Sequence, residues 1–184
     1  MRKNIFAICA VATMGLAVLT IPAKSQQDKS KRPSPPASAQ CNLGGGRMLK
    51  IDYSSPRMKG RKVYGDLVPW GQPWRAGANE ATTFVTDTDV LVGGKLVPAG
   101  SYTIFTVPNQ TEWKLIVQKT TGEWGIPYPP QKDAGELLRT DMRVSSLPAP
   151  VENFTIGFDQ AAGGCTLNMD WETTRASVKI SPKM

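Results

Sequence analysis

The sequence predicts an all-β fold, a single antiparallel β-sandwich or jelly-roll-like domain. Apolar and polar side chains alternate with a period of two in several segments, the pattern of strands that bury one face. Glycine, proline and other turn residues separate these segments at short intervals. Only residues 132–138 have the composition of a helix, and of a short one. Strands that recur with tight antiparallel turns are typical of sandwiches and jelly rolls.

The alternation is clear from the first predicted strand onward. There, Leu49, Ile51 and Tyr53 share one face, and polar residues occupy the other. The predicted strand segments are residues 49–53, 113–118, 154–158, 165–171 and 176–180. The glycine pair between "VLV" and "KLV" suits a two-residue hairpin, which needs positive φ angles. Further turns are predicted at residues 98–100, 108–110 and 172–174, the last with Glu172 and Arg175 facing solvent or each other.

The N-terminus has the features of a secretory signal peptide over residues 1–25. Arg2 and Lys3 precede an apolar run over residues 5–21, and Ala23 and Ser25 are small residues at the positions that a signal peptidase reads. The alternative is a transmembrane anchor, but the run is at the lower limit of length for crossing a bilayer. We therefore expect an exported protein, periplasmic or secreted, with no membrane span after cleavage.

Residues 26–40, "QQDKSKRPSPPASAQ", contain no aromatic or branched apolar residue and are predicted to form a disordered tether. Residues 41–184 then form one domain with a sizeable core. The formal net charge is +7, but Arg2, Lys3 and Lys24 belong to the predicted signal, so 19 of the 22 basic residues remain against 15 acidic ones. The folded part is nearly neutral, which argues against a nucleic-acid partner.

Two cysteines, Cys41 and Cys165, remain after removal of the signal that contains Cys9. In an oxidising compartment such a pair predicts a disulfide that joins the two ends of the domain. The alternative is two unpaired thiols. A catalytic thiol is disfavoured because the chain has no histidine to activate it.

The stretch "PWGQPWRAGANEATTF", residues 69–84, is the candidate binding site. Its prolines and glycines exclude a regular helix or a central strand and predict a shaped loop. One interpretation is structural: the two tryptophans plug an open end of the sandwich, and Arg75 pairs with Glu80. The other is recognition of a small molecule, glycan or partner by aromatic faces and directed polar groups. The candidate ligand-binding residues are Trp70, Trp74, Arg75, Asn79 and Glu80, with Arg57 and Arg61 as additional cations.

Enzymatic chemistry is disfavoured, and we predict no catalytic residue, metal site or cofactor. Histidine is absent, and the sequence contains neither a nucleophile elbow nor a phosphate-binding loop. The remaining alternative is a hydrolase with paired carboxylates, Glu80 with Asp66 or Glu123. Trp124 and Tyr128 in "GEWGIPYPP" either extend a ligand platform or belong to a loop that covers a sheet edge; we favour the cover.

Several stretches resemble the bacterial family named domain of unknown function 2911 (DUF2911). They are "YSSPRMKGRKVYGDLVPWGQPWRAGANEATTFV", "VGGKLVPAGSYTIFTVPN", "EWKLIV" and "WETTRASVKI". The resemblance runs from about Tyr53 to Ile180, and its most specific part is "WRAGANEATT", in which family members commonly carry threonine in place of Ala76. It implies a secreted, β-rich domain and leaves the function open, whether ligand binding, a purely structural envelope role or hydrolysis.

Overall fold

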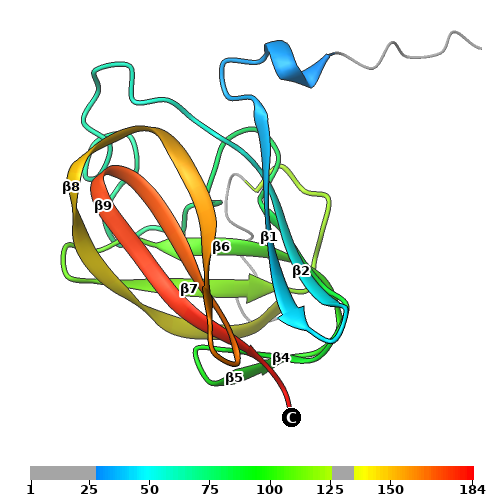
Figure 1. Cartoon of the computed structure of the whole chain (residues 1–184). Coiled ribbons are helices and arrows are strands. Elements are labelled where there is room, and N and C mark those ends of the chain that lie inside the picture. The colour runs from blue at the N-terminus through cyan, green and yellow to red at the C-terminus, as the bar shows by residue number, and fades with distance from the viewer. Residues whose placement is uncertain (1–27, 126–134) are drawn as a thin grey trace, which may run out of the picture.

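Nine strands form one antiparallel sheet, in the order β1-β2-β3-β6-β7-β8-β9-β4-β5 (Figure 1). The computed structural model describes residues 28–125 and 135–184. The elements are a 3-10 turn η1 (Lys29–Lys31) and the strands β1 (Pro36–Gly44), β2 (Arg47–Ser54), β3 (Thr83–Thr86), β4 (Val90–Val92), β5 (Lys95–Val97), β6 (Gly100–Val107), β7 (Glu112–Gln118), β8 (Glu136–Ala161) and β9 (Gly164–Pro182). No helix within these residues is long and apolar enough to cross a membrane.

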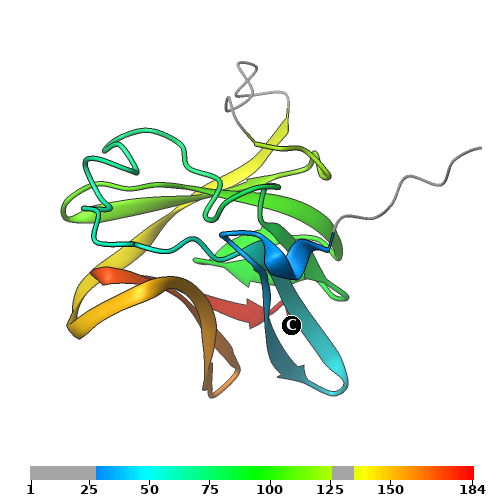
Figure 2. The same ribbon diagram turned by 90° about the horizontal axis from the view of Figure 1, so that it is seen from above.

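The sheet curls so that its distant parts face each other in two layers (Figure 2). One layer contains β6 and β7; the other contains β1, β2 and the far half of the β8–β9 hairpin. Two hydrogen bonds join β2 and its end to β8: Ile156 N–H donates to the Tyr53 hydroxyl (3.0 Å), and Ser55 Oγ donates to the Phe154 carbonyl (2.6 Å). The all-β, antiparallel class is therefore confirmed, and the layers predicted as a sandwich are parts of one continuous sheet.

The predicted disulfide is present between Cys41 of β1 and Cys165 of β9. The two Cα atoms lie 6.5 Å apart and are separated by 124 residues in sequence. Gln160 Nε2 donates to the Asn42 carbonyl (2.9 Å) next to the disulfide, so the tip of the β8–β9 hairpin is fastened to β1 by two kinds of bond. The first and last strands of the domain are thereby held together.

The core is formed by the alternating residues of the predicted strands. The fully buried side chains include Leu49, Ile51, Trp113, Leu115, Leu167, Met169 and Trp171. Ile116 is also buried, although its alternation places it on the opposite face of β7, because it packs with Ala81, Phe105 and Val107 in a second, smaller cluster. The sheet is therefore covered on part of its outer face as well.

Two local predictions in the last third of the chain need correction. In the predicted helix at 132–138, Gly135 is helical, residues 136–138 belong to β8, which begins at Glu136, and residues 132–134 lie outside the described part. No hairpin turn occurs at 172–174, because β9 continues through these residues. The pairing of β9 with β8 is irregular there, with register shifts on both sides of the pair between Val151 and Glu172. Glu172 has a φ of +54°, so the strand bends at a bulge instead of reversing. Arg175 pairs with Asp170, at 2.6 Å, and not with Glu172.

The predicted tether is partly folded. Its residues 36–40 form the first half of β1 and pair with residues 50–54 of β2. These residues have small side chains, and a ladder of backbone hydrogen bonds places them, while Ala37 and Ala39 pack against the core. The domain therefore begins before Cys41, and the rule that few apolar residues imply disorder did not account for an available strand edge. The predicted signal peptide, residues 1–25, lies outside the described residues.

Candidate functional site

The loop of residues 69–80 is held along β6 by backbone hydrogen bonds. Trp74 N–H donates to the Thr106 carbonyl (2.7 Å), and Thr106 N–H donates to the Trp74 carbonyl (2.8 Å). Gly71 N–H donates to the Pro108 carbonyl (2.8 Å), beside the β6–β7 turn. Ala76 is fully buried with a φ of +50°, a conformation that costs an alanine about 1–3 kcal/mol. The loop is thus a shaped segment, as its composition predicts, and its contacts to β6 determine its path.

Trp74 is partly buried and packs against the core. Its ring stacks on Trp171, with centroids 5.7 Å apart and planes at 18°, and meets Phe154 edge-on at 4.9 Å. The reciprocal bonds to Thr106 fix its backbone and turn its side chain inward. The contacts of Trp74 therefore agree with the structural interpretation of the loop, in which the tryptophans pack against the interior of the sandwich.

Trp70 lies at the rim of the same aromatic cluster. Its ring is stacked on Tyr64, with centroids 5.7 Å apart and planes at 27°, while Tyr64 packs edge-on against buried Trp113 at 4.9 Å. Gly65, with a φ of +92°, makes room for the indole, because a Cβ there would lie 2.7 Å from Trp70 Nε1. Trp70 remains 36% exposed. The indole is therefore supported from beneath and still open to solvent.

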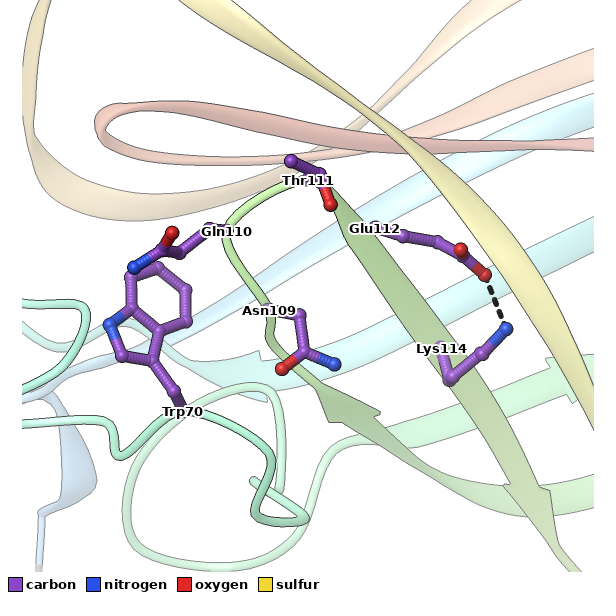
Figure 3. Close-up of a pocket in the computed structure, with 6 residues that line it drawn as sticks. All are labelled: Trp70, Asn109, Gln110, Thr111, Glu112 and Lys114. Carbon is purple, nitrogen blue, oxygen red and sulfur yellow. Dashed lines mark hydrogen bonds and ion pairs between the residues drawn. The ribbon is translucent and has the colours of Figure 1, made fainter.

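A hollow of about 450 Å³ lies beside the exposed indole. Trp70 and Gln110 form one side of it, Glu112 and Lys114 form the other, and Asn109 lies between them (Figure 3). Its lining residues are Trp70, Asn109, Gln110, Thr111, Glu112 and Lys114. Lys114 is ion-paired with both Glu112 and Asp141, and these contacts raise the pKa of the Lys114 ammonium, with Asp141 the larger cause. The hollow thus combines one aromatic face with amides, a hydroxyl and a fixed ion pair.

Arg75 turns away from this hollow, toward Trp124. Its guanidinium lies 5.7 Å from the centroid of the Trp124 ring, and Nη1 donates to the Trp124 carbonyl (3.3 Å). Burial lowers the pKa of Arg75, and the charge of Glu80 opposes this shift. Arg75 Nε is buried without a hydrogen-bond partner among the described residues. The predicted pair of Arg75 with Glu80 is therefore replaced by a cation–π contact. Tyr128, predicted beside Trp124, lies outside the described residues.

Asn79 and Glu80 fasten the N-terminal segment to the domain. Asn79 Nδ2 donates to the Ser34 carbonyl (2.9 Å), Arg32 Nη1 donates to both carboxylate oxygens of Glu80 (3.0 and 2.9 Å), and Lys29 Nζ lies 3.1 Å from one of them. The backbone N–H of Glu80, followed by Arg32 and Lys29, lowers the pKa of this carboxyl to about 2. Glu80 is therefore a charged anchor whose two oxygens are already occupied.

The additional cations, Arg57 and Arg61, have local partners. Arg57 Nη1 donates to the Ser55 carbonyl (3.1 Å) and hydroxyl (2.6 Å). Arg61 donates to the carbonyls of Met58 (2.9 Å) and Arg57 (2.7 Å). Both arginines stabilise the 55–61 turn, and neither lines the hollow beside Trp70.

Comparison with known families identifies the domain. Residues 34–180 match the family described as "Protein of unknown function (DUF2911)". The chain belongs to the DUF2911 family. Neither the curated proteins nor the solved structures contain a significant match to it. The family match begins two residues before β1, in agreement with the earlier start of the DUF2911 domain in the structure.

In this DUF2911 domain the hollow is formed by two segments, and only the loop that contains Trp70 is predicted as a site from the sequence. The other segment is the β6–β7 turn with the start of β7, residues 109–114, for which the sequence predicts only a turn at 108–110 and a strand from residue 113. A signal was present, since "NQTE" places four consecutive polar side chains in a hairpin connection that has no glycine. Their position beside Trp70 depends on the Gly71–Pro108 hydrogen bond, which no sequence pattern indicates.

The carboxylate alternative finds little support in the geometry. Both Glu80 oxygens accept hydrogen bonds from Arg32, and a general acid requires a raised pKa, whereas the pKa of Glu80 is lowered. The Glu123 carbonyl accepts from Ala81 N–H (3.0 Å), so its backbone lies beside the end of the loop. Within residues 28–125 and 135–184, no group of three or more acidic or cysteine side chains is placed to hold a metal ion.

Proposed function

We propose that this DUF2911 protein is an exported, non-catalytic binding protein that holds a saccharide in the hollow beside Trp70. The observation that carries the proposal is the position of Trp70: its indole is stacked on Tyr64, is kept open to solvent, and borders a recess lined by polar side chains. Flat aromatic faces bind the apolar face of a sugar ring, and neighbouring amides and hydroxyls bind its hydroxyl groups.

The composition of the recess supports a sugar more than an apolar ligand. Asn109 and Gln110 each provide an amide with both a donor and an acceptor, and Thr111 adds a hydroxyl. Trp70 is the one aromatic side chain among the lining residues. A recess with a single apolar surface and several adaptable polar groups suits a polyhydroxylated ligand.

Export is the second part of the proposal. The disulfide between β1 and β9 supports it, because such bonds persist in oxidising compartments. The predicted signal peptide over residues 1–25 agrees with the same location, periplasmic or secreted. Envelope and extracellular spaces are where a secreted domain meets polysaccharides.

The structural alternative has its own support, in the other half of the loop. Trp74 packs against the core, Arg75 packs on Trp124, and Glu80 anchors Arg32. These contacts account for residues 74–80 as scaffold. They do not account for the exposed indole of Trp70, which adds a single stacking contact to the fold.

Saccharide titration of a Trp70 variant tests the proposal. An array of neutral oligosaccharides identifies a ligand, whose affinity for the mature domain is then measured by isothermal titration calorimetry. We expect Trp70→Ala to weaken binding at least about tenfold, which corresponds to ~1.4 kcal/mol. Trp124→Ala is the matched control, because Trp124 is 54% exposed and does not line the hollow. The proposal is refuted if no oligosaccharide binds or if both variants weaken binding equally.

A further inference from the structure

A second hollow, of about 500 Å³, lies on the outward face of β8 and β9 beside the β4–β5 turn. Its walls include Gly93 of the turn, Asp141 and Arg143 of β8, and Thr166, Ser177 and Lys179 of β9. Arg143 is paired in register with Ser177, and Lys179 follows two residues later on the same face of β9. Two cationic and two hydroxyl side chains therefore gather around one recess.

The two cations of this hollow have no ionic partner among the described residues. Lys114 and Arg175, by contrast, are held in ion pairs on the neighbouring surface. Arg143 and Lys179 take part in no salt bridge and no side-chain hydrogen bond within residues 28–125 and 135–184, and both are exposed. Asp141 lines the same hollow and shares the Lys114 ammonium with Glu112, so the lining holds two cations, Arg143 and Lys179, against one carboxylate. The recess is left with an excess of positive charge.

The backbone of the β4–β5 turn forms one wall of this recess. Gly93 N–H donates to the Lys179 carbonyl (2.9 Å), so the turn is fixed against β9. Gly93 has a φ of +56°, and a Cβ at this position would clash with Thr140 of β8. Glycine at this position therefore lets the turn pack closely against β8, so that the turn forms a fixed wall of the recess.

The second hollow adjoins the first one across a single ion pair. Lys114 lines the hollow of Trp70 on the side nearest β8 (Figure 3), and its partner Asp141 lines the second hollow. β7, β8 and β9 are consecutive strands of the sheet. The backbones of Lys114 on β7 and Lys179 on β9 are therefore separated across the strands by two interstrand spacings, about 10 Å. One ligand of moderate length reaches both recesses without bending away from the sheet.

We propose that the second hollow is an anion subsite of the saccharide site, so that the ligand is an extended acidic saccharide. A neutral part of the ligand packs on Trp70, and a carboxylate, sulfate or phosphate group lies between Arg143 and Lys179 and accepts hydrogen bonds from both cations and from the Thr166 hydroxyl. This inference rests on the proposed function, because it extends the same site.

The test compares neutral and acidic saccharides of the same backbone. Calorimetric titration uses the neutral oligosaccharide identified for the Trp70 hollow and its uronate, sulfated and phosphorylated counterparts, which separates the three sources of negative charge. We expect at least one acidic form to bind about tenfold more tightly than the neutral one. The double variant Arg143→Gln/Lys179→Gln should remove this preference and leave the neutral affinity unchanged.

The control double variant, Lys62→Gln/Lys119→Gln, removes the same charge from exposed positions that line neither hollow. It should retain the preference for the acidic ligand. Equal affinity for the neutral and all acidic forms, or equal losses in the two double variants, overturns this inference and leaves the proposed function standing. Absence of any binding that depends on Trp70 overturns the proposed function instead.

Discussion

Trp70 and Trp74 are four residues apart in one loop, and they have opposite environments. Trp74 is packed between Trp171 and Phe154, with its backbone bonded in both directions to Thr106. Trp70 rests on Tyr64 with one ring face and borders a hollow. Both residues are tryptophans beside a proline, so their different exposure comes from the backbone contacts of each part of the loop. Backbone pairing to a central strand turns one indole inward, whereas the turn around Gly71 leaves the other at the rim.

Replacing Trp74 is the most damaging change that this comparison predicts. Trp74→Ala removes the ring that packs on Trp171 and Phe154, and because Trp74 is partly buried we expect a loss of about 3 kcal/mol in the free energy of unfolding, the lower end of the range for large aromatic side chains. Chemical denaturation followed by circular dichroism measures it. Trp70→Ala is the matched variant and should cost only about 1 kcal/mol, since it removes a single aromatic pair at the surface. Comparable losses for the two tryptophans would contradict the division into core and rim.

Substitution at Gly65 should have an intermediate effect and sharpen the comparison. Gly65→Ala introduces a Cβ 2.7 Å from Trp70 Nε1 at a φ of +92°, so the backbone is strained and the indole must move. Strain of this kind costs about 1–3 kcal/mol. We expect changed tryptophan fluorescence and weaker saccharide binding without substitution of any lining residue. Gly60→Ala is a suitable control, because Gly60 also has a positive φ, +70°, but a Cβ there would meet no atom within 4 Å. An unchanged saccharide affinity in Gly65→Ala would show that Tyr64 and Gly65 do not determine the position of Trp70.

The smallest effect concerns the other end of the loop. Glu80→Gln weakens the contacts to Arg32 and Lys29, and exposed ion pairs are worth at most about 1 kcal/mol. Global stability should therefore hardly change, while the segment before β1 becomes looser. Limited trypsin digestion should cleave after Lys29 and Lys31 several-fold faster than in the wild type. Asp52→Asn, which removes a carboxylate paired with Lys50 of the same strand, β2, is the control. An identical cleavage rate in Glu80→Gln and the wild type would remove Glu80 from its role as an anchor.

Acid should loosen the same segment. The pKa of Glu80 is about 2 in the folded protein against an ordinary value of 4.5, so its contribution is complete above about pH 4.5 and is lost as the pH falls toward 2. A carbon-13 NMR titration of the side-chain carboxyls measures this directly. A midpoint for Glu80 near 4.5 would mean that Arg32 and Lys29 do not hold it in solution.

The strands were predictable because alternation reflects burial on one face, as Leu49, Trp113 and Leu167 illustrate with full burial. The bend at Glu172 was not, since "ETT" has the composition of a turn and only the long ladder with β8 carries the strand through it. The first half of β1 was missed because small residues join a sheet through their backbone, which leaves no hydrophobic pattern. Local composition thus indicates strands well and strand boundaries poorly.

The candidate site was predictable to the same degree. Composition identified the loop as shaped and rich in functional groups, and it includes Trp70, beside which we propose that a ligand binds. The sequence did not show which side chains of the loop border the hollow and which pack elsewhere. Three of them have partners that are distant in sequence: Trp74 contacts Trp171, Arg75 contacts Trp124, and Glu80 contacts Arg32. Functional side chains that are close together in the sequence therefore point to different parts of the structure when each contacts a different element.

The order of strands also bears on how the protein behaves in concentrated solution. Of the two strands at the ends of the sheet, β5 has only three residues, begins with Lys95 and is followed at once by Pro98. The other, β1, receives a hydrogen bond from Gln160 at its Asn42 carbonyl and is tied to β9 by the disulfide. A short edge strand and an edge fastened near one end both offer less backbone on which a second molecule can extend the sheet. The β5 end of this domain is thus protected from edge-to-edge aggregation by its brevity, and the β1 end is held at Cys41 and Asn42 by the tip of the β8–β9 hairpin.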